Sequence, residues 1–201
     1  MRGFLILLVL MLLPVCSPAA DATHEAKAVF AGGCFWSMQI PFDKTPGVLE
    51  TVVGFTGGTL ADPTYEQVVE GNTGHLEAVQ VTYDATKITY DQLLNVYWRN
   101  IDPVDPRGQF CDKGPQYHTA IFYGSADEKQ KADDSKMLME ADDERFEGLP
   151  IATQILPAAK FYAAEDYHQS YYRKNPLRYN FYRGRCGHDQ RIEEIWGQSS
   201  H

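Results

Sequence analysis

Residues 27–36 read KAVFAGGCFW, an apolar run followed by two glycines, a cysteine and two large aromatic residues. The run at residues 27–31 predicts a strand, because valine and phenylalanine favour strands. Gly32 and Gly33 predict a tight turn, since glycine adopts backbone conformations that other residues avoid. A helix is expected to begin next to Cys34. This strand–turn–helix unit would place the Cys34 sulfur beside the free N–H groups of the helix N-terminus, which lower the pKa of a thiol.

The same stretch has two interpretations. Cysteine often behaves as a small buried hydrophobic residue, and Phe35 and Trp36 would then be ordinary core residues. Cys34 could instead be a reactive thiol beside a pocket for a small apolar group, because aromatic rings attract sulfur and methyl groups. The stretch alone leaves both interpretations open.

Periodic patterns along the rest of the chain predict a mixed fold. Residues 77–84 alternate, with Glu77, Val79 and Val81 on one face, as in a half-buried strand. Few strands mixed with helices indicate an α+β protein, a two-layer α/β sandwich with a ferredoxin-like core, followed by a long C-terminal coil. The other predicted strands cover residues 51–55, 116–123 and 151–156, and the predicted helices cover residues 64–70, 89–100, a long stretch from 125, and 165–174.

The N-terminus predicts export. A basic start and an apolar run (residues 4–13) precede small residues, and the run is too short for a bilayer span of about 20 residues. The bulky Val15 argues against a lipid anchor at Cys16. The expected parts are a signal peptide (1–20), a lead-in (21–26) and one domain (27–197), in a protein that is periplasmic or secreted.

The net charge and the number of cysteines narrow the classes of function that the protein can have. The net charge is −9 and no basic block stands out, which argues against nucleic acid as a partner. Removal of the signal peptide leaves Cys34, Cys111 and Cys186. An odd number of cysteines indicates a working thiol, although one structural disulfide with one buried thiol is the alternative. The spacing of histidines and cysteines matches no zinc motif, so no metal is expected.

Two further side chains could take part in chemistry. Glu77 is in phase with the buried face of its strand, where a carboxyl group has a raised pKa and can donate a proton. Its place at the start of the strand also allows an ordinary solvated glutamate. Tyr117 could offer its hydroxyl to a bound oxygen atom, or be an aromatic residue at the edge of the core.

Six blocks of the chain, in order and at similar spacing, resemble the peptide-methionine sulfoxide reductases of the A class, which act on the S epimer of the sulfoxide. Together they span residues 27–196, and a family assignment therefore does not depend on one motif. The blocks are GCFW (33–36), DPTYEQV (62–68), GNTGHLEAV (71–79), ITYDQLLNVYW (88–98), CDKGPQYHTAIF (111–122) and FYAAEDYHQSYY (161–172).

The resemblance implies roles for these residues. Cys34 would attack the sulfoxide sulfur and become a sulfenic acid. Phe35 and Trp36 would form the pocket for the substrate methyl group. The sulfoxide oxygen would be held, protonated and positioned by Glu77, Tyr65, Tyr117 and Asp112.

The chain end implies how Cys34 is recycled. Residues 180–197 resemble the tail of one branch of the family, in which the cysteine, here Cys186, resolves the sulfenic acid to a disulfide. Many relatives have no thiol at the position of Cys111, which could be a second resolving residue, a bystander or a structural thiol. A thioredoxin-like donor would reduce the disulfide. The implied enzyme is a monomer with no bound cofactor, acting on oxidised methionine, free or in proteins.

Two other functions compete with this one. A thiol hydrolase or acyltransferase would need a histidine base and an oxyanion hole for Cys34, and no histidine has a supporting context. A disulfide-stabilised binding module would pair Cys34 permanently with Cys111 or Cys186.

Overall fold

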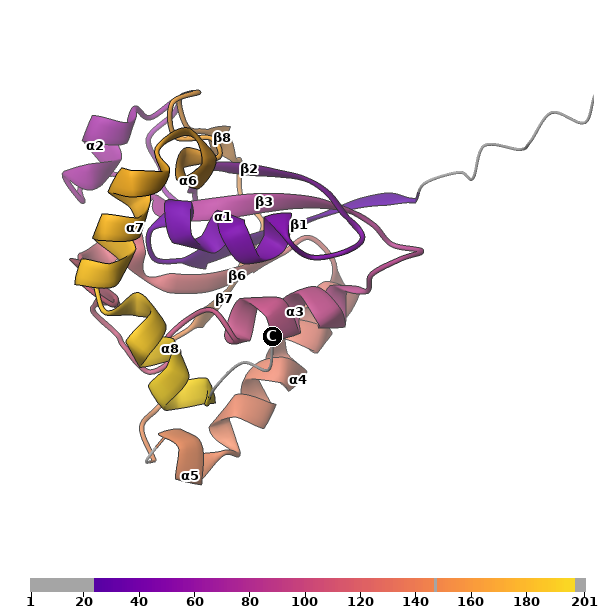
Figure 1. Cartoon of the computed structure of the whole chain (residues 1–201). Coiled ribbons are helices and arrows are strands. Elements are labelled where there is room, and N and C mark those ends of the chain that lie inside the picture. Colours follow the sequence, from indigo (N-terminus) through magenta and orange to yellow (C-terminus); the bar gives the residue numbers. More distant parts are fainter. Residues whose placement is uncertain (1–23, 147, 198–201) are drawn as a thin grey trace, which may run out of the picture.

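The computed structural model describes residues 24–146 and 148–197, so the predicted signal peptide lies outside the described residues. A six-stranded sheet has the order β7-β6-β1-β3-β2-β8, in which β6 and β7 are parallel and the other neighbours antiparallel (Figure 1). A separate hairpin pairs β4 with β5. The strands are β1 (Glu25–Gly32), β2 (Val48–Thr56), β3 (Leu76–Asp84), β4 (Gly108–Gln109), β5 (Asp112–Lys113), β6 (Thr119–Tyr123), β7 (Gln154–Pro157) and β8 (Tyr162–Ala163).

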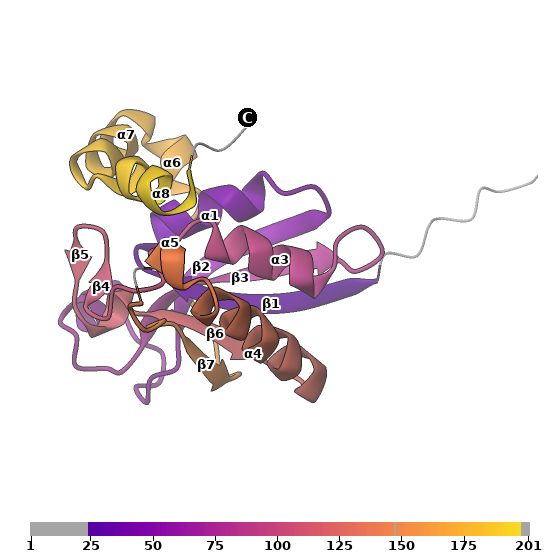
Figure 2. The same cartoon turned by 90° about the horizontal axis from the view of Figure 1, so that it is seen from below.

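Helices pack against the sheet and also form the C-terminal part of the described chain. Figure 2 shows α1 and α3 on the same side of the sheet, with the C-terminal helices near the β4–β5 hairpin. None of the helices within the described residues is long and apolar enough to span a bilayer. They are α1 (Phe35–Asp43), α2 (Tyr65–Val69), α3 (Tyr90–Trp98), the 3₁₀ helix η1 (Pro115–Tyr117), α4 (Ala126–Glu140), α5 (Asp143–Phe146), α6 (Tyr171–Lys174), α7 (Pro176–Arg185) and α8 (His188–Trp196).

The predicted two-layer α/β sandwich is confirmed. The elements β1-α1-β2-β3-α3-β6 follow one another in the chain, and their four strands lie in the order β6-β1-β3-β2. This is the split β-α-β arrangement of ferredoxin-like folds. Strands β7 and β8 extend the sheet at its two edges.

The main core lies between the sheet and the helices α1 and α3. Phe30 on β1 is fully buried and stacks on Phe42 of α1 and Tyr97 of α3, with ring centroids 5.1 and 5.2 Å apart. The Tyr97 hydroxyl donates a hydrogen bond to the Ala31 carbonyl at 2.9 Å, which satisfies a buried polar group. The strand that leads to Cys34 is therefore fixed on its helix-facing side.

The predicted C-terminal coil is wrong, because this part of the chain forms α6, α7 and α8. The helix expected at residues 165–174 is reduced to α6. Pro176 is the first residue of α7, a position that proline favours, and Gly187, with φ +64°, separates α7 from α8. Tertiary contacts hold α8, since Trp196 Nε1 donates to the Ile101 carbonyl at 3.1 Å.

Gly33 should be intolerant of a side chain. Its φ is +80°, and a Cβ atom there would lie 2.5 Å from Gln109 Cβ. Gly33→Ala should lower the free energy of unfolding by at least about 2 kcal/mol, through backbone strain and overpacking. Urea unfolding with the disulfide intact measures this.

Gly184→Ala is the matched control, because a Cβ atom there meets no atom within 4 Å. It should leave stability unchanged or raise it by up to about 1 kcal/mol, since alanine favours a helix. Equal effects of the two substitutions would contradict the close packing of Gly33 on Gln109.

Candidate active site

Cys34 lies at the junction of β1 and α1, as the sequence predicts. It is the N-cap residue of α1, and its carbonyl accepts hydrogen bonds from the amides of Ser37 at 3.0 Å and Met38 at 3.3 Å. At Gly32 a Cβ atom would lie 2.7 Å from Met38 Sδ, so the two glycines let the turn pack closely against its surroundings. The turn therefore holds the Cys34 thiol at the end of a central strand.

Glu77 is buried directly behind this turn. It lies on β3, is 1% exposed, and accepts a hydrogen bond from the Phe35 amide at 3.0 Å. Burial raises the pKa of Glu77 to about 8, the nearby Asp112 adds to the effect, and the Phe35 amide opposes it. The carboxyl group is therefore mainly protonated at neutral pH, and the expectation of a buried Glu77 is confirmed.

Two tyrosines add neutral hydroxyl groups. Tyr65 begins α2 and Tyr117 ends η1. Burial raises the pKa of both phenols well above the ordinary value, and the nearby charges of Glu77 and Cys34 raise it further. Both hydroxyls thus keep their protons and can donate hydrogen bonds to an oxygen atom beside Cys34.

The two aromatic residues after Cys34 have different surroundings. Phe35 is buried against Phe55 and His168. Trp36 remains partly exposed, and its Nε1 donates to His168 Nδ1 at 3.0 Å while its ring stacks on Tyr171 with centroids 3.8 Å apart. These contacts fix the orientation of the Trp36 indole at the edge of the site.

The predicted lowering of the Cys34 pKa is wrong for this structure. Burial raises the pKa of the thiol well above its ordinary value, and the neighbouring Glu77 and Asp112 raise it further. The Tyr182 hydroxyl and the Trp36 amide act in the opposite direction without outweighing these effects. The helix N-terminus does favour the thiolate, but desolvation and acidic neighbours are stronger.

The disulfide of this structure joins Cys111 to Cys186, with their Cα atoms 4.9 Å apart, and leaves Cys34 free. Cys111 is exposed at the β4–β5 hairpin, and Cys186 is the C-cap residue of α7. A module in which Cys34 is permanently paired disagrees with this arrangement. The sulfur atoms and an oxygen of Asp112 lie within 4.8 Å of one another, but cysteines in a disulfide offer no thiolate to a metal ion.

A family model described as "Peptide methionine sulfoxide reductase" matches residues 26–200. The chain belongs to this reductase family. A peptide methionine sulfoxide reductase MsrA of Halalkalibacterium halodurans is 49% identical over 172 residues, which cover 86% of this chain and 97% of that protein. The family expected from the six sequence blocks is confirmed.

Solved structures of reductases share the fold. Methionine sulfoxide reductase A of Corynebacterium diphtheriae has a TM-score of 0.73 at 34% identity, covering 78% of each chain. Mxr1 of Saccharomyces cerevisiae in its reduced form has a TM-score of 0.71 at 30% identity, covering 79% of this chain and 89% of that one. Mxr1 in complex with Trx2 matches in fold, with a TM-score of 0.52 at 21% identity over 78% of this chain and 90% of that one.

Within this reductase, the structure adds site residues that the sequence did not single out. His168 lies in the block FYAAEDYHQSYY, but its spacing from other residues matched no metal or catalytic motif. In the structure it is 1% exposed and accepts a hydrogen bond from Trp36. Tyr182 donates a hydrogen bond to Asp112 Oδ2 and meets Trp36 edge-on, with centroids 6.0 Å apart. Its position in a predicted coil gave no signal.

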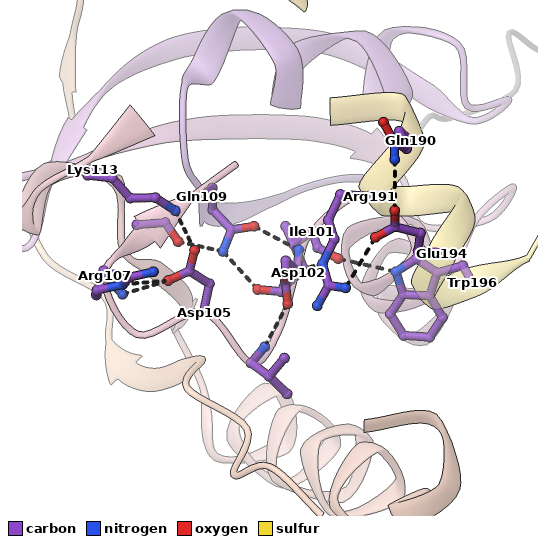
Figure 3. A network of polar contacts seen from close by, with 12 residues as sticks. Ile101, Asp102, Asp105, Arg107, Gln109, Lys113, Gln190, Arg191, Glu194 and Trp196 are labelled. Atoms are coloured by element: carbon purple, nitrogen blue, oxygen red, sulfur yellow. Dashed lines mark hydrogen bonds and ion pairs between the residues drawn. The ribbon is translucent and has the colours of Figure 1, made fainter. Parts of the chain in front are cut away.

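A polar network ties the hairpin to the rest of the reductase (Figure 3). The Gln109 side chain is fully buried, accepts from the Asp102 amide and donates to the Asp102 carbonyl, each at 2.8 Å. Arg191 of α8 donates to Asp102 Oδ2 at 2.7 Å. Because Gln109 also packs against Gly33, this network joins α8, the hairpin and the turn before Cys34.

Alkylation of Cys34 tests the electrostatics of the site. With Cys111 and Cys186 in their disulfide, iodoacetamide labelling of Cys34 should have a pH midpoint above the ordinary thiol value of about 8.5. Glu77→Gln should lower this midpoint, because it removes a carboxylate that is ionised before Cys34 titrates. Mass spectrometry of the Cys34 peptide gives the rates. A wild-type midpoint near neutral pH would instead support the helix-end effect predicted from the sequence.

Proposed function

We propose that this protein reduces methionine S-sulfoxide, free or in proteins, to methionine, with Cys34 as the nucleophile. The observation that carries the proposal is the buried carboxyl group of Glu77, which accepts from the Phe35 amide and lies next to the only free cysteine of the described residues; burial raises its pKa, so that it can act as an acid. A sulfoxide oxygen is a poor leaving group until it is protonated, so the reaction needs an acid beside a thiol.

The reaction follows from this pairing. Cys34 Sγ forms a bond to the sulfoxide sulfur, while the oxygen takes the proton of Glu77 and hydrogen bonds from Tyr65 and Tyr117. The thiol proton restores Glu77. The S–O bond of the substrate and the transient bond between the two sulfur atoms then break as the hydroxyl passes to Cys34 Sγ, so that methionine leaves and Cys34 becomes a sulfenic acid.

The aromatic residues support the choice of substrate. Trp36 presents a fixed, partly exposed indole beside the thiol, and the buried Phe35 lies between the site and the hydrophobic core. An apolar wall of this kind suits the S-methyl group of methionine sulfoxide. Asp112, held by Tyr182, would complete the polar side of the pocket.

Recycling would use both remaining cysteines. Cys186 attacks the sulfenic acid, water leaves, and a Cys34–Cys186 disulfide forms. Cys111 then attacks Cys186, which releases Cys34 and produces the Cys111–Cys186 pair. The observed Cys111–Cys186 disulfide and the free Cys34 match the end product of these two steps.

A thioredoxin-like donor would reduce the final disulfide. Cys111 is exposed, so its sulfur is open to attack by a second protein. The complex of yeast Mxr1 with Trx2 supports a donor of this class. We also propose that the enzyme is exported from the cytoplasm, because of the predicted signal peptide, and that it acts as a monomer.

The epimers of methionine sulfoxide test the reaction. The reduced enzyme should convert the S epimer to methionine and leave the R epimer unchanged, as measured by methionine formed. Cys34→Ser should abolish turnover, and Glu77→Gln should slow methionine release roughly 10²–10⁴-fold through loss of the acid. Equal turnover of both epimers, or turnover by Cys34→Ser, would contradict the proposal. The rival thiol hydrolase would instead show a hydrolytic activity that is lost when either Cys34 or a histidine base is substituted.

Single substitutions separate the two recycling cysteines. Cys186→Ser and Cys111→Ser should each release about one methionine per enzyme, because neither residue acts before the sulfenic acid forms. Cys186→Ser should then stall with thioredoxin, whereas Cys111→Ser should accumulate a Cys34–Cys186 disulfide. Peptide mapping distinguishes the products. Normal thioredoxin-dependent turnover by Cys186→Ser would assign the first resolving step to Cys111.

A further inference from the structure

Tyr182 is a side chain of α7 that lies against three residues of the site. Its hydroxyl donates a hydrogen bond to Asp112 Oδ2 and lies close enough to the Cys34 thiol to lower the pKa of that thiol. Its ring meets the Trp36 indole edge-on at an interplanar angle of 87°. The residue thus joins a carboxyl group to the reacting sulfur.

The position of Tyr182 is coupled to the recycling disulfide. Cys186 lies one helical turn after Tyr182, and its amide donates to the Tyr182 carbonyl at 2.9 Å. On the other side, Asp112 directly follows Cys111. The disulfide and the Tyr182–Asp112 hydrogen bond therefore connect the same two segments, and both are present in the state in which Cys34 is free.

Release of Cys34 from a disulfide poses an electrostatic problem. In thiol–disulfide exchange the leaving sulfur takes the electron pair, and exchange is slower when that thiol has a high pKa. The acidic groups that face Cys34 disfavour a negative charge on it, and Tyr182 is the hydroxyl that stabilises it. The titratable groups around Cys34 are Glu77 of β3, Asp112 of β5, Tyr65 of α2, Tyr117 of η1 and Tyr182 of α7.

We propose that Tyr182 is a further catalytic residue, which protonates Cys34 as Cys111 displaces it from Cys186. This role rests on the proposed function. The Cys111 thiolate, having lost its proton to solvent, forms the bond to Cys186 Sγ. The Cys34–Cys186 bond breaks, and its electron pair goes to Cys34 Sγ.

Protons and electrons balance without another reactant. Cys34 takes the hydroxyl proton of Tyr182, which regains a proton from Asp112 or from solvent. One disulfide is present before and after the step, so no external oxidant or reductant is consumed. The hydrogen bond to Asp112 and the nearness of the Tyr182 hydroxyl to Cys34 supply the path that the proton needs.

Tyr179 provides the matched control for a purely structural role. It lies on the same helix, is 3% exposed, and its hydroxyl contacts Ser37 Oγ at 3.4 Å and Arg183 Nη1 at 2.9 Å. Tyr179→Phe removes one buried hydroxyl from α7, as Tyr182→Phe does, but leaves Asp112 and Cys34 untouched.

A single-turnover experiment follows the transfer step. Reduced enzyme receives one equivalent of methionine S-sulfoxide, and samples quenched with acid are mapped for disulfides over time. After methionine has been released, Tyr182→Phe should transfer the disulfide from Cys34 to Cys111 at least tenfold more slowly than the wild type, with the transfer rate measured from the appearance of the Cys34–Cys186 disulfide in each enzyme. The wild type and Tyr179→Phe should show rapid formation of the Cys111–Cys186 pair.

Alkylation gives a second readout that needs no sulfoxide. In the Cys111–Cys186 form, Tyr182→Phe should raise the pH midpoint of Cys34 labelling, because a donor to the thiolate is lost. Simple loosening of α7 would expose Cys34 to water and lower the midpoint instead.

The outcomes separate the two proposals. Equal transfer rates for Tyr182→Phe and Tyr179→Phe, or a lowered midpoint, would overturn the role of Tyr182 and leave the reductase function standing. A wild-type enzyme that releases no methionine would overturn the reductase function, and the transfer step with it.

Discussion

A hydrogen bond from the Phe35 amide to the buried carboxyl group of Glu77 connects the start of α1 to the central strand β3. This contact satisfies a free amide of the helix N-terminus and also positions an acid behind Cys34. Because Glu77 is almost completely buried, its charged form is disfavoured and it keeps a proton at neutral pH. The turn, the helix and the acid of the site thus depend on one buried carboxyl group.

That arrangement also determines the state of the thiol. Acidic groups and burial together favour a protonated Cys34, so the site holds its reactive sulfur as a thiol until a substrate or a proton acceptor changes the balance. The C-terminal helices contribute the opposing effect, because the Tyr182 hydroxyl lowers the pKa of Cys34, and they carry Cys186 at the end of the same helix. The chemistry of reduction and the chemistry of recycling therefore meet at Cys34 and Asp112.

Much of the site could be predicted because its parts are local or periodic. The two glycines and Cys34 form a continuous strand–turn–helix unit, and the period of two in β3 placed Glu77 on the helix-facing side. The C-terminal helices could not be predicted in the same way. Their residues are polar and tyrosine-rich, and α8 is held by distant contacts such as Arg191 to Asp102.

The sequence by itself determined the α+β sandwich, the placement of Cys34 at the start of a helix, and the family, because short-range patterns and ordered motifs specify these features. Only the tertiary structure decided that the pKa of Cys34 is raised, that Cys186 is paired with Cys111, and that Tyr182 reaches Asp112. These properties depend on burial and on contacts between segments that are far apart in the chain. Desolvation and such long-range contacts have no signature in a local stretch of residues.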